Sequence, residues 1–411
     1  MKIVMKRLVW IWVALLAAVF MGRAAQAGDL QLSGKQHWLT VASSKDKNVA
    51  IGIARQAAGY GGKDQVVSSA SGYYAVILGP YEANSIEELK KNGKGSFDEL
   101  PKDALLSQGA NYLKVVWSNE PLSLGLVSFS LAKAAEFSVD GLQAKVIGQP
   151  LEKDTAYVEV TGTDKSGANF NFDIGKDAKP DEQDSAESYA SEDFHKAGIA
   201  RLTKDGEPQI IVTQFSGGAH CCTSTWIMSR ASGAASWAMI EGDTLDGDGY
   251  WVEDLEGDGA LELMSVDNSF LYAFDSYAGS FAPITISRLE GGKIEDVTDQ
   301  PQFKPRLAQD LAGIEFQAKS NPDLWRSNGF LVGWLASKMR LGQGDEAWAK
   351  FMANYDKKSG FGPQICTTGQ KIDDCPADKM RPQPIPEAVA EFLNDKSYGP
   401  LPKAAQALLK K

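Results

Sequence analysis

The distribution of apolar positions divides the chain into three parts with different periodicities. Over residues 36–117, short alternating or continuous apolar runs typical of strands are separated by two segments with apolar residues at helical spacing. Residues 119–300 carry mostly strand-like runs, and from residue 324 apolar residues recur at intervals of three and four. The pattern predicts an α+β fold with an N-terminal domain over residues 28–118, a β-rich domain over 119–318 and a helical region over 319–411.

The N-terminal part shows the clearest order of elements. Strands are predicted over residues 37–41, 65–67, 73–78 and 112–117, and helices over residues 48–58 and after residue 85. Ser85 is the expected N-cap of the second helix, and Glu88 completes a capping box. The resulting order βαββαβ predicts one sheet backed by two helices.

Two of these strands resemble those of the SPOR (sporulation-related repeat) family of peptidoglycan-binding domains. The resemblance is carried by Trp38–Ser43 and by Tyr74–Tyr81, which ends in Gly-Pro-Tyr before a helix. It is confined to this part of the chain and implies that an exposed sheet face contacts glycan strands stripped of their peptides. The candidate binding residues are Trp38, Thr40 and Tyr73.

The sequence departs from the family on that face. Polar or basic side chains of the family are matched here by Thr40, Ala75 and Ile77. The alternative to glycan binding is therefore that this sheet face packs against the rest of the protein.

The central part contains a weak internal repeat. Residues 199–211 align without a gap on residues 252–264, and each copy has a turn around Asp-Gly followed by an apolar strand. Recurrence at this distance is typical of repeated β units, so the central domain is predicted to be built of propeller-blade-like sheets.

The second copy contains a loop rich in oxygen donors. Side-chain carboxylates stand at Asp254, Glu256, Asp258 and Glu262, and Ala260 can offer its carbonyl. The spacing resembles the DxDGDGxxE calcium loops of FG-GAP and VCBS-type repeats, which implies Ca²⁺ as a structural cofactor bound by these five residues. Calcium prefers six to eight oxygen ligands, and such a loop supplies most of them. The alternative is a simple polar turn.

The first residues have the features of an export signal. Three basic residues precede the apolar run 8–21, and Ala25-Gln26-Ala27 gives a small-x-small cleavage pattern. A signal peptide over residues 1–27, cleaved after Ala27, predicts a periplasmic or secreted protein without stable membrane insertion. Retention of the apolar run as an anchor is the alternative.

The net charge excludes some partners. The chain carries −11 at neutral pH, and because residues 1–27 hold four basic and no acidic residues, the remainder carries −15. Nucleic-acid binding requires clustered Lys and Arg, so a nucleic-acid partner is not expected.

The four cysteines suit an oxidising compartment. Cys221, Cys222, Cys366 and Cys375 allow three connectivities, of which pairing of the near neighbours is favoured. His220 beside Cys221 suggests a thiol enzyme as an alternative, but adjacent residues on an extended strand point to opposite faces.

Together these patterns predict a non-enzymatic exported binding protein that recognises cell-envelope or peptidoglycan material, or a protein partner. No nucleophile, base and oxyanion arrangement can be identified in the sequence. The alternatives are a cell-envelope thiol hydrolase centred on His220 and Cys221, and a scaffold protein of an envelope assembly.

Overall fold

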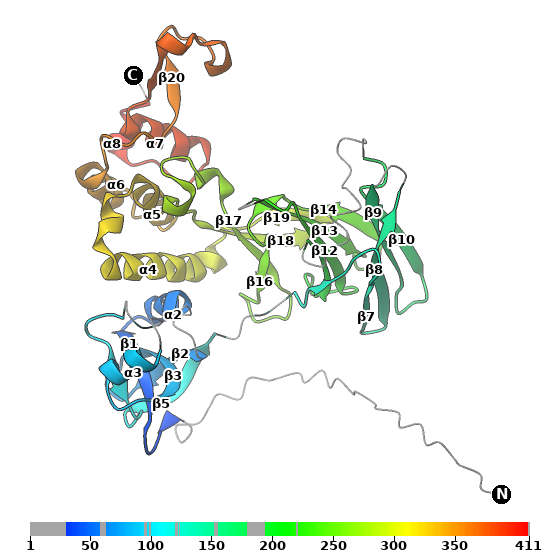
Figure 1. The fold of residues 1–411 in the computed structure, drawn as a ribbon, viewed down its shortest axis with the longest axis horizontal. Helices are drawn as coiled ribbons and strands as arrows, with labels where there is room; N and C mark the ends of the chain where they lie inside the picture. The colour runs from blue at the N-terminus through cyan, green and yellow to red at the C-terminus, as the bar shows by residue number, and fades with distance from the viewer. Residues whose placement is uncertain are drawn as a thin grey trace, which may run out of the picture.

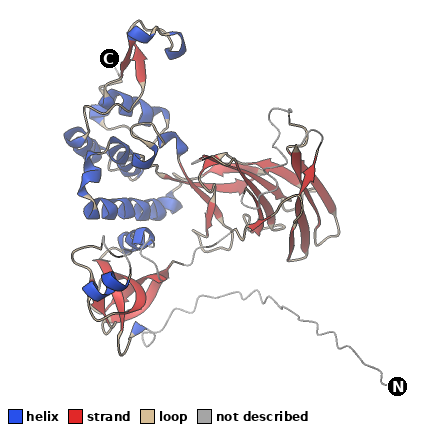
Figure 2. Cartoon of the chain, viewed as in Figure 1, coloured by secondary structure: helices blue, strands red, loops and turns tan. Residues whose placement is uncertain are grey.

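The fold is α+β, with an N-terminal sheet backed by helices, a β-rich central region and a helical C-terminal region (Figures 1 and 2). The computed structural model describes residues 30–57, 63–93, 97, 100–119, 122, 124–151, 155–178, 194–218 and 221–409. The predicted signal peptide, its cleavage site after Ala27 and His220 of the thiol-enzyme alternative lie outside the described residues.

The N-terminal domain is one antiparallel sheet with two helices. Its elements are β1 (Gln36–Ser44), α2 (Lys47–Ala57), β2 (Lys63–Ser69), β3 (Tyr74–Glu82), α3 (Ile86–Asn92), β4 (Leu105–Ser107) and β5 (Tyr112–Ser118). The strand order is β4-β1-β3-β2-β5. The predicted order βαββαβ is present with β4 as an added edge strand. The predicted N-cap is confirmed, because the Ser85 hydroxyl accepts from the Glu88 N–H at 3.1 Å. The Glu88 carboxylate accepts from the Asn84 N–H at 2.8 Å, one residue before the N–H that a capping box uses.

In its described residues, the central region contains three sheets, each built around four strands that follow one another in sequence. The first sheet contains β7 (Ala135–Val139), β8 (Leu142–Pro150), β9 (Ala156–Thr163) and β10 (Asn169–Ile174). The second contains β11 (His195–Ala200), β12 (Gln209–Phe215), β13 (Cys221–Ser229) and β14 (Ala238–Glu241), with β6 (Val127–Ser128) and β15 (Leu245–Asp246) at its margins. The third contains β16 (Trp251–Glu253), β17 (Glu262–Val266), β18 (Ile284–Glu290) and β19 (Lys293–Asp296). Sequential antiparallel sheets of this kind have the connectivity of propeller blades.

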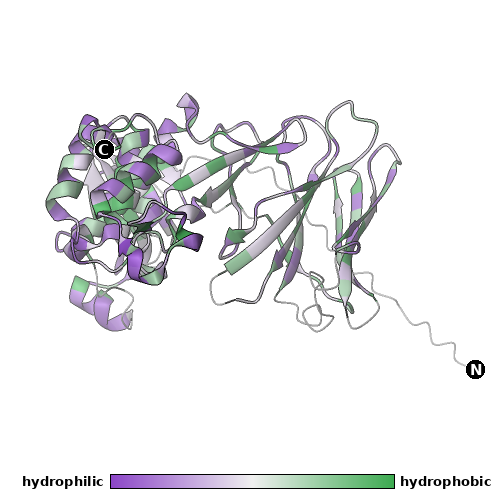
Figure 3. Cartoon of the chain, turned by 90° about the horizontal axis from the view of Figure 1, so that it is seen from above, coloured by the Kyte–Doolittle hydropathy of each residue, from purple (hydrophilic) through white to green (hydrophobic). Residues whose placement is uncertain are grey.

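The three sheets pack on one another through separate apolar clusters. Val146 and Val160 of the first sheet share a core with Val212 of the second. The opposite face of the second sheet packs on the third, and the far face of the third packs on Leu307 in the helical region. On β8 of the first sheet, buried residues alternate with exposed ones such as Gln143 and Lys145. Seen from above, the strands accordingly show alternating hydrophobic and hydrophilic residues (Figure 3).

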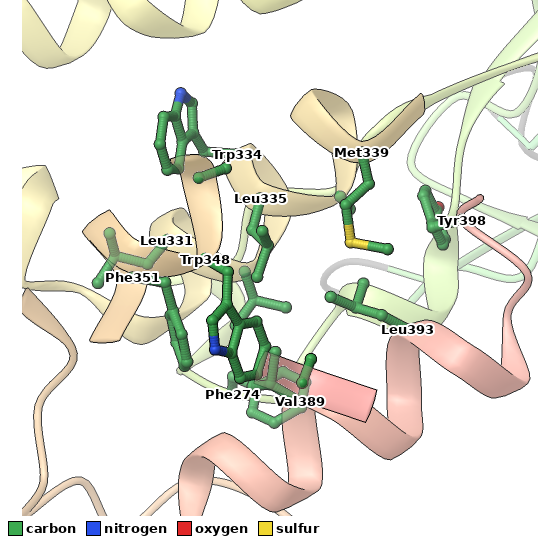
Figure 4. Close-up of a cluster of buried hydrophobic side chains, with 14 of the residues drawn as sticks. Phe274, Leu331, Trp334, Leu335, Met339, Trp348, Phe351, Val389, Leu393 and Tyr398 are labelled. Atoms are coloured by element: carbon green, nitrogen blue, oxygen red, sulfur yellow. The ribbon is translucent and has the colours of Figure 1, made fainter. Parts of the chain in front are cut away.

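The helical region begins earlier in the chain than residue 319. Its elements are α4 (Lys304–Ser320), α5 (Asn328–Arg340), α6 (Gly344–Asn354), α7 (Ile385–Asp395), α8 (Lys403–Gln406) and a ribbon of β20 (Gln364–Cys366) and β21 (Met380–Pro382). Short 3₁₀ turns lie at Asn268–Phe270, Tyr277–Gly279, Pro301–Phe303, Pro322–Arg326, Ile372–Asp374 and Ala377–Lys379. Figure 4 shows the core of this region, where side chains from α5, α6 and α7 meet Phe274 of the preceding loop. Among the described residues, no helix has both the length and the apolar character needed to cross a membrane.

Helix α4 joins the three parts of the molecule. It lies along α2 of the N-terminal domain (Figure 1), and Gly52 of α2 approaches it so closely that a Cβ there would stand 2.0 Å from the Gln309 carbonyl oxygen. Leu307 of the same helix packs on the third sheet, and Leu311 packs into the helical core. Helix α4 therefore contacts all three parts of the molecule.

Candidate functional site

The face of the N-terminal sheet that was predicted to bind glycan is buried by the chain itself. Trp38 is 6% exposed, and its indole N–H donates to the Leu30 carbonyl at 2.8 Å. Thr40 is hydrogen-bonded to the Tyr112 hydroxyl at 2.6 Å. Leu30 packs with Trp38, Ala75 and Ile77 in one cluster, so these side chains serve packing in the structure.

The third residue predicted for this face, Tyr73, lies apart from the other two. It is 39% exposed and has the Lys45 ammonium 5.5 Å from its ring centroid. The structure thus does not bring Trp38, Thr40 and Tyr73 together on an accessible surface.

The carboxylate loop of residues 254–262 forms the predicted tight turn. Asp254 accepts hydrogen bonds from the N–H groups of Gly257, Asp258 and Gly259 at 2.7, 3.1 and 3.1 Å. Asp258 in turn accepts from the Ala260 N–H at 2.9 Å. The side chains at the predicted positions shape the backbone of this turn.

Two basic side chains of the protein form ion pairs with the carboxylates of this loop. Arg288 donates through Nε and Nη2 to one oxygen of Glu262 at 3.0 and 2.7 Å, and it also pairs with Glu256. Lys204 pairs with Asp258 at 2.7 Å. Burial raises the pKa of Glu262, whose side chain is 2% exposed, and the charges of Asp258 and Asp254 add to this.

The loop as arranged does not fit a calcium ion. Calcium requires several oxygens directed at one point, whereas these oxygens are directed at backbone N–H groups, Arg288 and Lys204. Over the ranges that the structure describes, no group of three or more His, Cys, Asp or Glu side chains could hold a metal ion. Calcium binding by Asp254, Glu256, Asp258, Ala260 and Glu262 stays a prediction from sequence.

The cysteines are paired with their near neighbours. Cys366 and Cys375 form a disulfide with a Cα–Cα distance of 5.7 Å, and Cys221 is bonded to Cys222. All four cysteines lie in described segments and none has a free thiol. A thiolate nucleophile, which the thiol-enzyme alternative requires, is therefore not present in this arrangement.

A cleft of about 580 Å³ lies where the N-terminal domain, the third sheet and α4 meet, and we call it the junction cleft. Trp117 at the end of β5 and Trp251 on the edge strand β16 both line it. Its other lining side chains include Arg55, Asn119, Glu253, Gln302, Arg306 and Gln309. Aromatic rings and multivalent hydrogen-bonding groups therefore share one concave surface.

A network of charges centred on Glu253 fixes the wall of the junction cleft. Its carboxylate accepts from Arg306 at 3.1 Å, from Arg55 at 2.9 Å and from the Trp251 indole N–H at 3.2 Å. The Arg55 guanidinium lies 5.3 Å from the Trp117 ring centroid. Each part of the molecule thus contributes one charged member: Arg55 from α2, Glu253 from β16 and Arg306 from α4.

Arg306 retains unused hydrogen-bonding capacity. It is 8% exposed, and its Nη1 has no hydrogen-bond partner among the described residues. That nitrogen forms a long ion pair with Asp310 Oδ1 at 3.9 Å, and burial raises the pKa of this carboxyl. Because Nη1 is buried, a ligand in the cleft has no access to this donor, and the guanidinium serves to hold Glu253 in the cleft wall.

The charge of Glu253 predicts a pH dependence. Burial acts to raise the pKa of Glu253, but Arg306 and Arg55 outweigh it and hold the pKa below the ordinary 4.5. A carboxyl whose pKa is lower in the folded state contributes stability above its unfolded pKa, and the contribution is lost as pH falls through the folded value. Glu253→Gln is therefore expected to reduce stability at neutral pH and to lessen the loss of stability below pH 4.5, measured by urea unfolding across pH. A stability that falls as steeply below pH 4.5 in the variant as in the wild type would contradict this prediction.

Sequence reasoning missed this site because its members are scattered. Arg55, Trp117, Trp251 and Arg306 come from four elements and share no motif. Trp251 stands three residues before Asp254, the first carboxylate of the loop, but nothing in the sequence links it to the other three residues.

Comparisons with known proteins place the chain among uncharacterised relatives. Residues 305–397 match the sll0997 C-terminal domain family, which corresponds to α4 through α7. Uncharacterized protein y4bJ of Sinorhizobium fredii is 34% identical over 391 residues, which are 93% of this chain and 60% of that protein. Probable thylakoid lumen protein sll0997 of Synechocystis sp. is 31% identical over 195 residues, which are 46% of this chain and 56% of that protein.

The chain spans less than two thirds of the length of either relative. No solved structure matches it.

Proposed function

We propose that this chain is a non-enzymatic, extracytoplasmic binding protein that recognises a cell-envelope glycan in the junction cleft. The observation that carries the proposal is the presence of Trp117 and Trp251 in one cleft with the Arg55–Glu253–Arg306 network. The glycan expected from the N-terminal domain is thereby assigned to a different surface of the molecule.

The chemistry of the cleft supports a sugar as the ligand. Tryptophan presents a large apolar face with a polar N–H at its edge, which suits the mixed surface of a pyranose ring. Trp251 is 38% exposed, and the nearby amides of Asn119, Gln302 and Gln309 can each donate and accept hydrogen bonds. Such groups match hydroxyls, which also donate and accept.

The construction of the cleft supports binding without chemistry. The charges of Glu253, Arg55 and Arg306 are directed at one another, so they orient the wall and do not form an acid and a base on opposite sides of a bond. A wall held in place before binding lowers the entropic cost of capturing a ligand.

Two observations support a location outside the cytoplasm. Residues 1–27 have the composition of an export signal, and one relative bears the name of a probable thylakoid lumen protein. These observations support an extracytoplasmic location, and we propose that this location is the periplasm.

The proposal predicts the effect of truncating Trp251 in the junction cleft. Trp251→Ala is expected to weaken binding of soluble peptidoglycan glycan strands at least tenfold, because central aromatic contacts carry more than about 1.4 kcal/mol. Binding would be measured by calorimetry and by pull-down on intact and amidase-treated peptidoglycan sacs.

The matched control is Phe361→Ala, which removes an aromatic that is 44% exposed and lies in the segment before β20, away from the cleft lining. This control should bind as the wild type does. Wild-type protein that binds neither the strands nor either kind of sac would rule out the glycan and favour a scaffold role.

A further inference from the structure

A second cleft adjoins the junction cleft and differs from it in chemistry. It has a volume of about 560 Å³ and shares Leu122, Trp251 and Val252 with the junction cleft. We call it the apolar cleft, because most of its other lining residues are apolar: Leu124, Leu126, Phe194, Phe215 and Tyr250. Its charged lining residues are Lys196 and Asp248.

The aromatic wall of the apolar cleft is ordered by packing. The rings of Phe194 and Phe215 are stacked, with centroids 6.2 Å apart and planes 7° from parallel. Tyr250 is 6% exposed and donates its hydroxyl hydrogen to Asp243 at 2.8 Å, which leaves its ring as an apolar surface.

The ridge between the two clefts is apolar and accessible. Leu122 is 48% exposed and Trp251 is 38% exposed, although both side chains belong to the linings of two concave surfaces. Apolar surface that remains exposed in a cleft is a sign of ligand binding, because burying it elsewhere would stabilise the free protein.

We propose that the two clefts form one bipartite site for an amphiphilic glycan, with its sugar in the junction cleft and its alkyl chain in the apolar cleft. This inference rests on the proposed function and specifies the ligand class for the same site. The change from polar to apolar lining across Trp251 matches the change from sugar to hydrocarbon within one molecule.

An alkyl chain suits the apolar cleft better than an extended peptide does. Its lining includes Thr213 on β12 and Thr223 on β13, and each of these strands is already paired on both sides. A peptide there would find free backbone partners only along the short edge strand β16, and its remaining unpaired amides would be costly to bury. A hydrocarbon chain has no such groups.

The inference is tested with alkyl glucosides of increasing chain length, kept below their micelle concentrations and titrated into the full chain. Affinity is expected to rise about fourfold per added methylene up to octyl glucoside, which is the effect of burying about 0.8 kcal/mol per CH₂. Free glucose is the reference ligand.

Two variants test the apolar cleft, and of these only Phe215 lies outside the junction cleft. Phe215→Ser is expected to abolish the chain-length dependence while leaving the binding of free glycan strands unchanged. Leu122→Asn should weaken the octyl glucoside about tenfold, whereas Leu409→Asn, at a leucine 36% exposed and outside both clefts, should not. Thermal melting of each variant verifies that it is folded.

The outcomes distinguish the two proposals. Glycan strands that bind while octyl glucoside binds no better than glucose would overturn the bipartite site and leave the proposed function standing. Octyl glucoside that binds with full chain-length dependence, but without any effect of Trp251→Ala, would support the apolar cleft and overturn the glycan assignment. A soluble leucine-rich peptide that displaces octyl glucoside through Phe215 would overturn the alkyl assignment.

Discussion

Arg288→Ala is expected to lower the free energy of unfolding by about 3–5 kcal/mol, the range found when one partner of a buried ion pair is removed. The variant leaves the Glu262 carboxylate, 2% exposed, without the two hydrogen bonds that it accepts from the guanidinium. Glu256 loses the same partner. Urea unfolding followed by circular dichroism measures the effect.

The control for this variant is another arginine in a surface ion pair. Arg326 lies 3.8 Å from Asp323 and both side chains are more than four-fifths exposed, so Arg326→Ala should change stability by less than about 1 kcal/mol. Arg288→Lys is informative as well, because it keeps the charge but cannot donate through two nitrogens in a fixed plane. The free energy of unfolding of Arg288→Lys should lie between those of the wild type and Arg288→Ala.

The same variant decides the role of calcium. With Arg288 in place, calcium and chelator are expected to give the same melting temperature, because the guanidinium occupies oxygens of both Glu256 and Glu262. In Arg288→Ala these carboxylates become available and calcium should recover part of the lost stability. A wild-type melting temperature that rises with calcium would contradict this expectation and would support the calcium site predicted from the sequence.

The sequence pattern predicted those helices and strands that pack on a single neighbouring element through one apolar face. In the N-terminal domain, β1, α2, β3 and β5 were identified from their apolar spacing, and the Ser85 cap was identified from its residue types. Strand β4 was missed because three residues are too few to show a period.

Helix α4 was missed for a different physical reason. Leu307 packs on the third sheet, Leu311 packs in the helical core and Phe316 packs in the core of the N-terminal domain. A helix with neighbours on three sides has apolar residues around its circumference, so no single stripe marks it in the sequence. The early start of the helical region follows from this one element.

The candidate site could not be predicted from local patterns at all. The residues selected for their chemistry, such as Trp38 and the carboxylates of the loop, are engaged in packing or in internal ion pairs. The residues of the junction cleft come together only when α2 docks on α4, which brings Arg55 to Glu253. That docking is determined by small residues and backbone contacts, which leave little trace in hydropathy.

Gly52→Ala is accordingly expected to disrupt both the stability of the molecule and its binding. The added Cβ would stand 2.0 Å from the Gln309 carbonyl oxygen and 3.0 Å from the Ala312 Cβ, so the helices must move apart. Because the main obstacle is backbone and not a flexible side chain, the cost should reach the upper end of overpacking effects, about 3 kcal/mol. Separation also weakens the bonds of Gln309 to Arg55 and Asn48.

The readouts for Gly52→Ala are urea unfolding and the affinity for glycan strands, which should fall together because Arg55 and Trp117 move away from Glu253 and Trp251. The control is Gly360→Ala, at a glycine where an added Cβ meets no atom within 4 Å. A Gly52→Ala protein with lower stability but unchanged affinity would mean that binding does not need the junction between the domains. In that case the third sheet alone, with Trp251 at its edge, would be sufficient to hold the ligand.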